Sequence, residues 1–332
     1  MFEKGYYVFQ RYNLSFTKIA ACISRRSAMR EERKGSDLAL IIHADDYGIT
    51  LEQSRAILDL SDACGGHGAL SSISIFANSP AFAECADLAR PFVERGAISI
   101  GVHVNVVEGH PLSDPRDIPL LVNEHGTFNH AFTGLLLASS LHTVDRDGIR
   151  EQLAREIAAQ LERYLEAFPE QRRRLRIDTH QHTHMVPLVH DALIAASRRA
   201  DCVATRARIP VEPIGPYLAH PARAVKVAPI NLVKDALLKF LAPHCRKDLE
   251  DECVVPAFSG IVMSGRMDKM TPEILADLEA RAAKEGRDLE VLFHPVSVPI
   301  EQCLDPENLP FARACASPGR DREAQLIRDL AK

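Results

Sequence analysis

Short apolar runs alternate with longer stretches of helical periodicity from residue 38 to the end of the chain. The clearest helical stretch is 147–168, where Ile149, Leu153, Ile157, Leu161 and Leu165 recur every four residues along one face. Apolar strands separated by helices are typical of a parallel sheet covered on both faces. The runs predict eight strands, at 38–43, 71–77, 97–104, 174–178, 202–206, 223–228, 253–258 and 288–293. We therefore expect an α/β fold, a distorted (β/α) barrel of mostly parallel strands with surrounding helices.

Local signals mark where some of these elements begin. Thr50 and Gln53 have the spacing of a capping box at the start of the first helix. Pro187 suits the first turn of a helix that continues over 188–199. The segment 108–146 interrupts the alternation with several prolines and glycines, and it is longer than an ordinary connecting loop. We interpret it as an insertion that forms a lid or shapes a substrate site.

The first 36 residues do not continue the pattern. They mix aromatic, basic and serine residues, and their longest apolar stretch, at 19–23, is too short for a secretory signal. A targeting segment is the alternative interpretation. We expect a poorly ordered N-terminal extension at 1–36, followed by a single (β/α) barrel domain at 37–332 that contains the insertion. We also expect a cytoplasmic protein.

The composition is that of a globular protein, since 46% of the 332 residues are hydrophobic and 26% are charged. The net charge of −5 argues against a general nucleic-acid binder, which is usually basic. None of the eight cysteines falls in a CxxC pair, so the sequence favours reduced thiols over a zinc ribbon or a thioredoxin-type site. No run of 18 apolar residues predicts a membrane span.

Polar side chains follow most of the predicted strands. Barrel enzymes place their active sites at the carboxyl ends of the strands, so these residues are expected to surround one end of the barrel. In chain order the residues at these strand ends are Asp45, Asp46, Asn78, His103, Asn105, Asp178, His180, His182, His184, Arg206, Ser259, Gly260 and His294.

The adjacent acids Asp45 and Asp46 need an explanation, because neighbouring like charges repel and couple their ionisation. A divalent cation held by two imidazoles and one carboxylate, with water completing the shell, is a common hydrolytic site. One aspartate would bind such a metal, and the other would take a proton from the water beside it. Both acids share a site only where the strand bends, and Gly48 supplies the freedom for that bend.

Each of these residues also has a structural interpretation. The acidic pair is compatible with an exposed loop or helix caps, and His103 with a hydrogen-bonded core histidine. The 180–184 cluster is compatible with a solvated turn, and His294 with a strand cap. Arg206 and Arg208 are ambiguous between site and surface. Four independent segments would have to place such groups at strand ends by chance, so we favour a metal site.

Motifs along the chain resemble those of a known family. They read "ADDYG", "GVHVN", "EGHPL", "IDTHQHTHMVP" and "EVLFHP" in that order, and the closing "DREAQLIRDL" is similar as well. The likeness covers about 38–300, and the family is that of the YdjC-like carbohydrate deacetylases, which include chitooligosaccharide deacetylases. The resemblance implies a distorted (β/α) barrel that removes acetyl groups from N-acetylated sugars with one divalent metal ion.

The resemblance also implies roles for individual residues. It makes Asp46, His103 and His180 the metal ligands, Asp45 the general base and His294 the general acid. Arg206 is expected to keep Asp45 ionised or to contact the sugar. The ligand types favour Zn²⁺ as the metal, and Mg²⁺, Mn²⁺ or Co²⁺ are also compatible. The expected substrate-binding residues are Tyr47, Asn78, Asn105, His182 and His184.

The chain departs from the family pattern in places that affect the substrate. Family members commonly have Phe at the position of Tyr47, and the first 36 residues have no counterpart. The 108–146 insertion lies where members vary, and "EGHPL…DIPLLVNEHGTF" resembles a hopanoid-linked branch that acts on lipid-attached aminosugars. The expected partner is therefore an N-acetylated saccharide or an aminosugar conjugate. Pairing of barrels into a homodimer is compatible with the sequence.

Two other functions remain as alternatives. One is another metal-dependent hydrolase or isomerase on a similar barrel, such as a two-metal phosphoesterase, for which Asp178, His182 and His184 would supply further ligands. The other is a sugar-binding homologue that has lost turnover.

Overall fold

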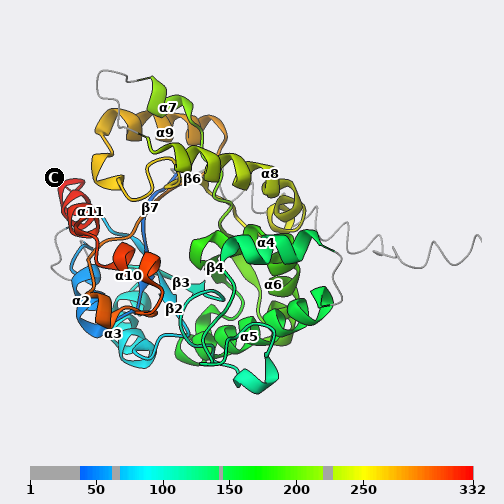
Figure 1. Cartoon of the computed structure of the whole chain (residues 1–332). Coiled ribbons are helices and arrows are strands. Elements are labelled where there is room, and N and C mark those ends of the chain that lie inside the picture. The colour runs from blue at the N-terminus through cyan, green and yellow to red at the C-terminus, as the bar shows by residue number, and fades with distance from the viewer. Residues whose placement is uncertain (1–37, 62–67, 142–144, 220–226, 332) are drawn as a thin grey trace, which may run out of the picture. The chain divides into compact units, whose positions relative to one another are not determined.

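The computed structural model describes residues 38–61, 68–141, 145–219 and 227–331. Ala39–Lys332 form one compact unit, and the extension expected at 1–36 lies outside the described residues. Seven parallel strands form one sheet in the order β5-β4-β3-β2-β1-β7-β6 (Figure 1). They are β1 (Leu40–Tyr47), β2 (Ser72–Phe76), β3 (Ser99–Val104), β4 (Leu175–Thr179), β5 (Ala204–Ala207), β6 (Ala257–Ser259) and β7 (Leu289–Phe293).

The sheet is a barrel that is nearly closed. From β1 to β5, and from β6 to β7, strands adjacent in sequence pair with each other. Because β7 also pairs with β1, the remaining gap lies between β5 and β6. A single parallel bridge between Arg206 and Val254 crosses that gap. The predicted distorted (β/α) barrel is therefore confirmed, with one strand fewer than expected in the described part of the chain. The predicted strand at 223–228 falls largely on 220–226, which lie outside the described residues.

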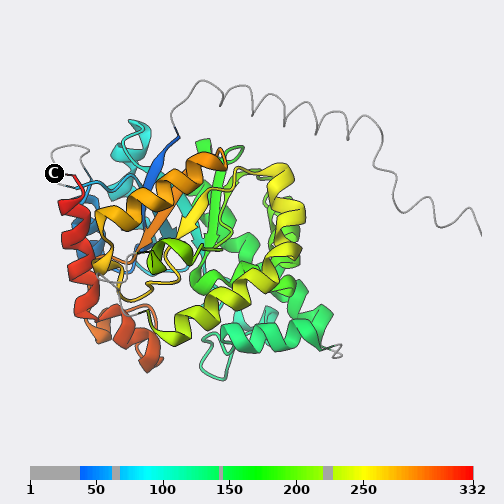
Figure 2. The ribbon, with the colours of Figure 1, turned by 90° about the horizontal axis from the view of Figure 1, so that it is seen from above.

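Helices follow the strands and cover the outside of the sheet (Figures 1 and 2). The apolar face predicted within 147–168 is buried in α5, which packs against α6. Thr50 caps α2 as predicted, because its hydroxyl accepts from the backbone N–H of Gln53 at 3.0 Å. The helices are α2 (Leu51–Leu58), α3 (Phe82–Glu94), α4 (Phe132–Ser140), α5 (Arg146–Ala167), α6 (Pro187–Arg199), α7 (Gly215–Leu218), α8 (Pro229–Glu252), α9 (Pro272–Lys284), α10 (Leu309–Cys315) and α11 (Pro318–Asp329). None of them, over the described residues, has both the length and the apolar composition needed to cross a membrane.

The interior of the barrel is charged as well as apolar. Arg176 on β4 donates to Glu290 on β7 at 2.8 Å and to the hydroxyl of Ser72 at 2.7 Å. A side chain at Gly101 would come within 3.0 Å of Arg176, so the glycine makes room for the arginine. Buried charges are tolerated only when they are paired and hydrogen-bonded. The barrel therefore carries a paired ionic layer beneath its carboxyl end.

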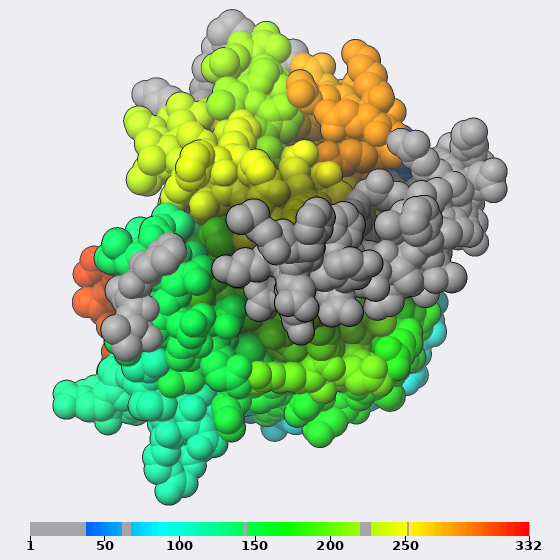
Figure 3. Space-filling view, turned by 90° about the vertical axis from the view of Figure 1, so that its right-hand side faces the viewer, coloured from blue at the N-terminus to red at the C-terminus, as the bar shows by residue number. Residues whose placement is uncertain are grey.

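The predicted insertion at 108–146 leaves the barrel after β3 and contains a short 3₁₀ turn (Pro115–Asp117) and α4. It is fastened to α5, because Glu156 accepts from the backbone N–H groups of Leu112 and Ser113 at 3.0 and 2.8 Å. Its teal part protrudes from the face seen in Figure 3. A role as lid or substrate-shaping segment stays a prediction.

Candidate metal centre

A bend at the end of β1 turns both acids of the pair toward the barrel interior. Between Ala44 and Tyr47 the pairing with β2 gains one residue, which is a β-bulge. Asp46 has a φ of 61° and Gly48 a φ of 97°. The bend therefore lies at Asp46 as well as at the predicted glycine. Gln53 fixes it by donating its side-chain amide to the carbonyl of Asp46 at 3.0 Å.

Replacing Gly48 with alanine is expected to destabilise the fold by about 1–3 kcal/mol, because a Cβ is strained at this positive φ. That Cβ would also lie 2.9 Å from Cγ1 of Ile75. Denaturant unfolding would measure the loss. Gly215→Ala is the matched control, since a Cβ there meets nothing within 4 Å. Equal unfolding free energies for the two variants would contradict the account of the bend.

His103 is oriented by a carboxylate on the neighbouring strand. It lies opposite Asp178 in the pairing of β3 with β4, and its Nδ1–H donates to Oδ1 of Asp178 at 2.5 Å. That bond leaves the lone pair of Nε2 free, and a second partner of this kind is usual for a histidine that binds a metal. Burial lowers the pKa of His103, but the carboxylates of Asp45, Asp178 and Asp46 outweigh it and raise that pKa. The surroundings therefore favour positive charge at this point.

His180 begins the loop that follows β4, a 3₁₀ segment at His180–Met185. Gln181 and His182 have φ values of 53° and 56°, so the chain turns sharply directly after His180. The ring of His180 packs against the rings of Phe76 and Phe311, with centroids 5.1 and 5.2 Å away. The ring is thereby placed beside Asp46.

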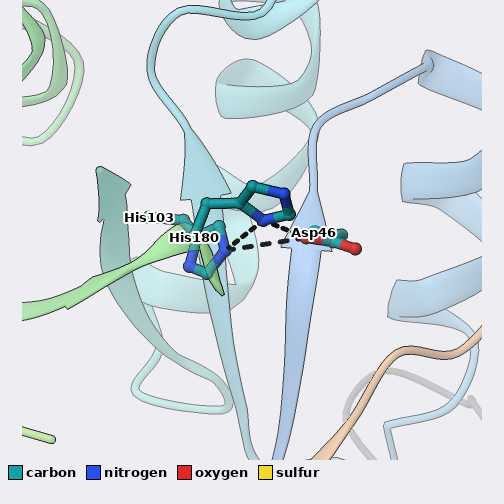
Figure 4. A group of neighbouring side chains, drawn as sticks. All are labelled: Asp46, His103 and His180. Carbon is teal, nitrogen blue, oxygen red and sulfur yellow. Dashed lines mark hydrogen bonds and ion pairs between the residues drawn. The ribbon is translucent and has the colours of Figure 1, made fainter. Parts of the chain in front are cut away.

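Asp46, His103 and His180 bring three ligand atoms together (Figure 4). Oδ1 of Asp46 lies 3.3 Å from Nδ1 of His180 and 3.6 Å from Nε2 of His103, and the two nitrogens are 3.4 Å apart. Ligands of a tetrahedral Zn²⁺, each at about 2.0–2.1 Å from the ion, lie roughly 3.3–3.4 Å from one another. Oδ1 of Asp46 is buried and has no hydrogen-bond partner among the described residues. The three side chains therefore fit a divalent cation.

Arg320 holds the other oxygen of Asp46. Its guanidinium donates to Oδ2 at 2.6 Å, and its side chain is only 8% exposed. Burial raises the pKa of Asp46, but Arg320, His180 and His294 together outweigh it and keep that pKa well below its usual value. Asp46 is thus ionised, with one oxygen left for a metal. Nothing in the sequence pointed to Arg320, which lies on α11, 274 residues further along the chain.

Arg208 keeps Asp45 ionised. Its guanidinium donates to both carboxylate oxygens of Asp45, at 2.8 and 2.9 Å, and to Glu290 at 2.7 Å. Burial raises the pKa of Asp45, but Arg208, His103 and His43 together outweigh it and hold that pKa well below its usual value. The role expected of Arg206 is wrong, because its guanidinium binds Asp288 at 2.8 Å instead.

A second group of possible ligands consists of His43, Asp45 and Asp178. The guanidinium of Arg208 already lies among these carboxylates, 2.8 Å from Asp45 and 3.5 Å from Asp178. Of the further ligands expected for a two-metal enzyme, Asp178 belongs to this group, whereas His182 and His184 do not. His184 donates Nε2–H to the carbonyl of Arg208 at 2.8 Å, while its Nδ1 accepts from Thr179 at 2.7 Å. The geometry therefore favours one metal over two.

His294 lies directly after β7, half-buried, and its backbone N–H donates to Glu323 at 2.7 Å. Burial lowers the pKa of His294 to about 4, and the charge of Asp46 only partly opposes that effect. Its imidazole is thus neutral at pH 7, and an imidazolium formed there would give up its proton more readily than an ordinary one.

Several residues expected to bind substrate have structural roles. The Tyr47 hydroxyl is buried and donates to the carbonyl of Cys85 at 2.9 Å. Asn78 donates to the carbonyl of His110 at 3.0 Å, and Asn105 to that of Glu108 at 2.8 Å. These bonds explain the three side chains, and that of His184, without a substrate, and sugar binding by them stays a prediction. His182 alone stays half-buried, and its Nδ1 has no hydrogen-bond partner among the described residues.

Comparison with known proteins gives a consistent result. The family model described as "YdjC-like protein" matches residues 39–329. A carbohydrate deacetylase of Geobacillus stearothermophilus is 30% identical over 199 residues, which cover 60% of this chain and 69% of that protein. A human carbohydrate deacetylase is 29% identical over 78% of this chain and 75% of its own length. A chitooligosaccharide deacetylase of Serratia marcescens is 30% identical, over 46% of this chain and about half, 52%, of its own length.

The fold also has a counterpart among solved structures. The crystal structure of an Enterococcus faecalis protein matches with a TM-score of 0.55 over 88% of this chain and 91% of that chain. The sequence identity is 19%, so this likeness concerns the fold alone.

Proposed function

This chain belongs to the YdjC-like protein family, and we propose that it uses the Asp46–His103–His180 centre to remove acetyl groups from N-acetylated sugars. It is a carbohydrate deacetylase, a hydrolase that acts on the amide bond of its substrate. The observation that carries the proposal is the convergence of one carboxylate oxygen and two imidazole nitrogens within 3.6 Å of one another.

The metal is proposed to be a single divalent cation. Two imidazoles and one carboxylate suit Zn²⁺ first, and Mg²⁺, Mn²⁺ or Co²⁺ are compatible. When bound, such a cation polarises the acetamide carbonyl and makes water a better nucleophile. Around the centre the carboxylates of Asp45, Asp46, Asp178 and Glu290 face the guanidinium groups of Arg176, Arg208 and Arg320. Four carboxylates against three guanidinium groups leave one negative charge in excess, which favours the binding of a cation.

Asp45 is proposed to take the proton from the attacking water. Its Oδ1 already accepts from His43, Ser74 and Arg208, while within the described residues Oδ2 accepts from Arg208 alone. A carboxylate has about four accepting positions, so Oδ2 has the remaining capacity. Arg208 keeps the group ionised, which is the state that a general base requires.

His294 is proposed to give a proton to the leaving nitrogen. It directly follows β7, the strand that pairs with β1. Because burial keeps its imidazole neutral at pH 7, the proton that it passes to the nitrogen is the one that Asp45 takes from the attacking water, so that the C–N bond breaks and the amine leaves neutral. Asp45 and His294 thus divide proton transfer between them. Of the predicted sugar contacts, His182 remains as a candidate because its Nδ1 has no partner in the described chain.

The proposal predicts acetate release from at least one member of a panel of N-acetylglucosamine monosaccharides and oligosaccharides, with chelator-treated protein inactive. A coupled acetate assay on metal-loaded protein measures it, and the panel is extended to lipid-linked aminosugars. Binding of a saccharide without any acetate would overturn the proposal in favour of a sugar-binding homologue. Hydrolysis of phosphate esters in place of amides would overturn it in favour of a phosphoesterase. The expected cytoplasmic location and homodimer stay predictions.

A further inference from the structure

A buried carboxylate that takes no part in the chemistry above lies near the metal centre. Glu108, in the loop after β3, is 2% exposed. Its Oε1 accepts from the side-chain amide of Gln181 at 2.8 Å, and its Oε2 accepts from that of Asn308 at 2.7 Å. One carboxylate therefore joins three segments: its own loop, the loop that begins with His180, and the C-terminal arm, defined here as residues 294–315.

The backbone that carries Glu108 is firmly held. Asn105 accepts from the backbone N–H of Val107 at 3.1 Å and of Glu108 at 3.0 Å. The N–H of Gly109 donates to Asp305 of the arm at 3.0 Å. A Cβ at Gly109 would lie 2.6 Å from the carbonyl oxygen of Leu304, so loop and arm are in close contact. Glu108 is thus a fixed point from which the other two segments can be aligned.

The two histidine ligands differ in how they are oriented. His103 donates its second nitrogen to Asp178, the usual arrangement for a histidine that binds a metal. His180 has no such partner, because its Nε2 is buried and lacks a hydrogen bond within the described chain. The direction of its ring must therefore be set by the segments that surround it.

Both partners of Glu108 act on His180. Gln181 follows it directly and has a φ of 53°, a conformation that is unfavourable for most residues other than glycine. Asn308 is the N-cap residue of α10, and Phe311 of that helix places its ring 5.2 Å from the ring of His180. Glu108 thus holds both the backbone turn beside the ring and the helix that packs on it.

We propose that Glu108 is the positioning residue for the metal ligand His180, in place of the hydrogen bond that this histidine lacks. The inference rests on the proposed function for the identity of the ligands. Outer-shell partners of metal ligands commonly change affinity by about 10–100-fold. Glu108 is expected to change the affinity for the metal to a similar degree, through His180, without contacting the metal or the substrate.

The test is Co²⁺ binding to chelator-treated protein, followed by the visible absorption of the ion, which reports its coordination geometry. Glu108→Ala removes both acceptors, and Asn308→Asp places two carboxylates together. Each is expected to weaken Co²⁺ binding about 10–100-fold and to alter the spectrum. The double variant Glu108→Gln, Asn308→Asp restores one hydrogen bond with donor and acceptor exchanged. It is expected to bind within about threefold of the wild type.

Two further variants separate positioning from general damage. Gln181→Ala removes an exposed side chain and is expected to weaken Co²⁺ binding about tenfold in a folded protein. Glu301→Gln is the matched control, since it removes a charge from an exposed position of the arm away from Glu108 and Gln181, and it is expected to leave the spectrum unchanged. Normal Co²⁺ affinity and an unchanged spectrum in both Glu108→Ala and Gln181→Ala would overturn the inference. Failure of the wild type to bind Co²⁺ would instead overturn the metal centre itself.

Discussion

Replacing Asp46 with alanine is expected to remove the bound metal and to lower turnover by at least about 10³-fold. The loss of one of three protein ligands accounts for the first effect, and the loss of several kcal/mol of electrostatic stabilisation accounts for the second. Elemental analysis of the purified variant and the acetate assay measure the two effects separately.

The alanine also leaves Arg320 buried without the carboxylate to which it donates at 2.6 Å. Breaking a buried pair in this way is itself destabilising, by about 3–5 kcal/mol. Asp46→Asn is therefore the companion variant, because its amide oxygen can still accept from Arg320 while binding a metal more weakly. A folded Asp46→Asn protein with the full metal content and turnover of the wild type would remove Asp46 from the set of ligands.

Replacing Asp45 with asparagine is expected to leave the metal in place and to lower turnover by roughly 10²–10⁴-fold, the usual cost of losing a general base. The amide keeps the shape of the side chain but cannot take a proton at neutral pH. Acetate release per bound metal ion is the measurement, since it separates loss of chemistry from loss of the ion.

Glu290→Gln is the matched control for Asp45→Asn. It removes the other carboxylate that the Arg208 guanidinium binds, at 2.7 Å. Glu290 lies in the barrel interior beside Arg176 and takes no part in proton transfer. We expect a less stable protein with turnover within about tenfold of the wild type. An Asp45→Asn variant that releases acetate as fast as Glu290→Gln would show that another group is the base.

The barrel and the metal centre were predictable because their signals are local. Each strand is a short apolar run, and in a parallel barrel the residues that follow the strands meet at one end. Asp46, His103 and His180 all lie at such strand ends, so the three side chains could be expected to lie close together. The bend at β1 had a local signal too, in Gly48, although Asp46 itself also has a positive φ.

The partners of these residues were not predictable from local signals. Arg320 reaches Asp46 from α11, and Asn308 reaches Glu108 from 200 residues away. Arg206 was expected beside Asp45, but Arg208 occupies that place. The predicted strand ended at residue 206, whereas β5 ends at Ala207, so the first arginine beyond the strand is Arg208.

The polar residues that proved structural have a common explanation. A strand end that enters a loop leaves backbone N–H and C=O groups without partners, and a nearby amide or imidazole can satisfy them. Asn78, Asn105 and His184 do this at the ends of β2, β3 and β4. Position at a strand end therefore predicts proximity to the site, and only the hydrogen bonds decide which side chains are free to act there.

The central claim is a deacetylase with one metal ion per chain, and a single titration tests it directly. Chelator-treated protein receives Zn²⁺ in increments, and acetate release from the best N-acetylated sugar is recorded at each step. The account predicts that activity rises in proportion to Zn²⁺ and reaches its plateau at one ion per chain. A plateau at two ions per chain, or acetate release that does not depend on metal, would contradict it.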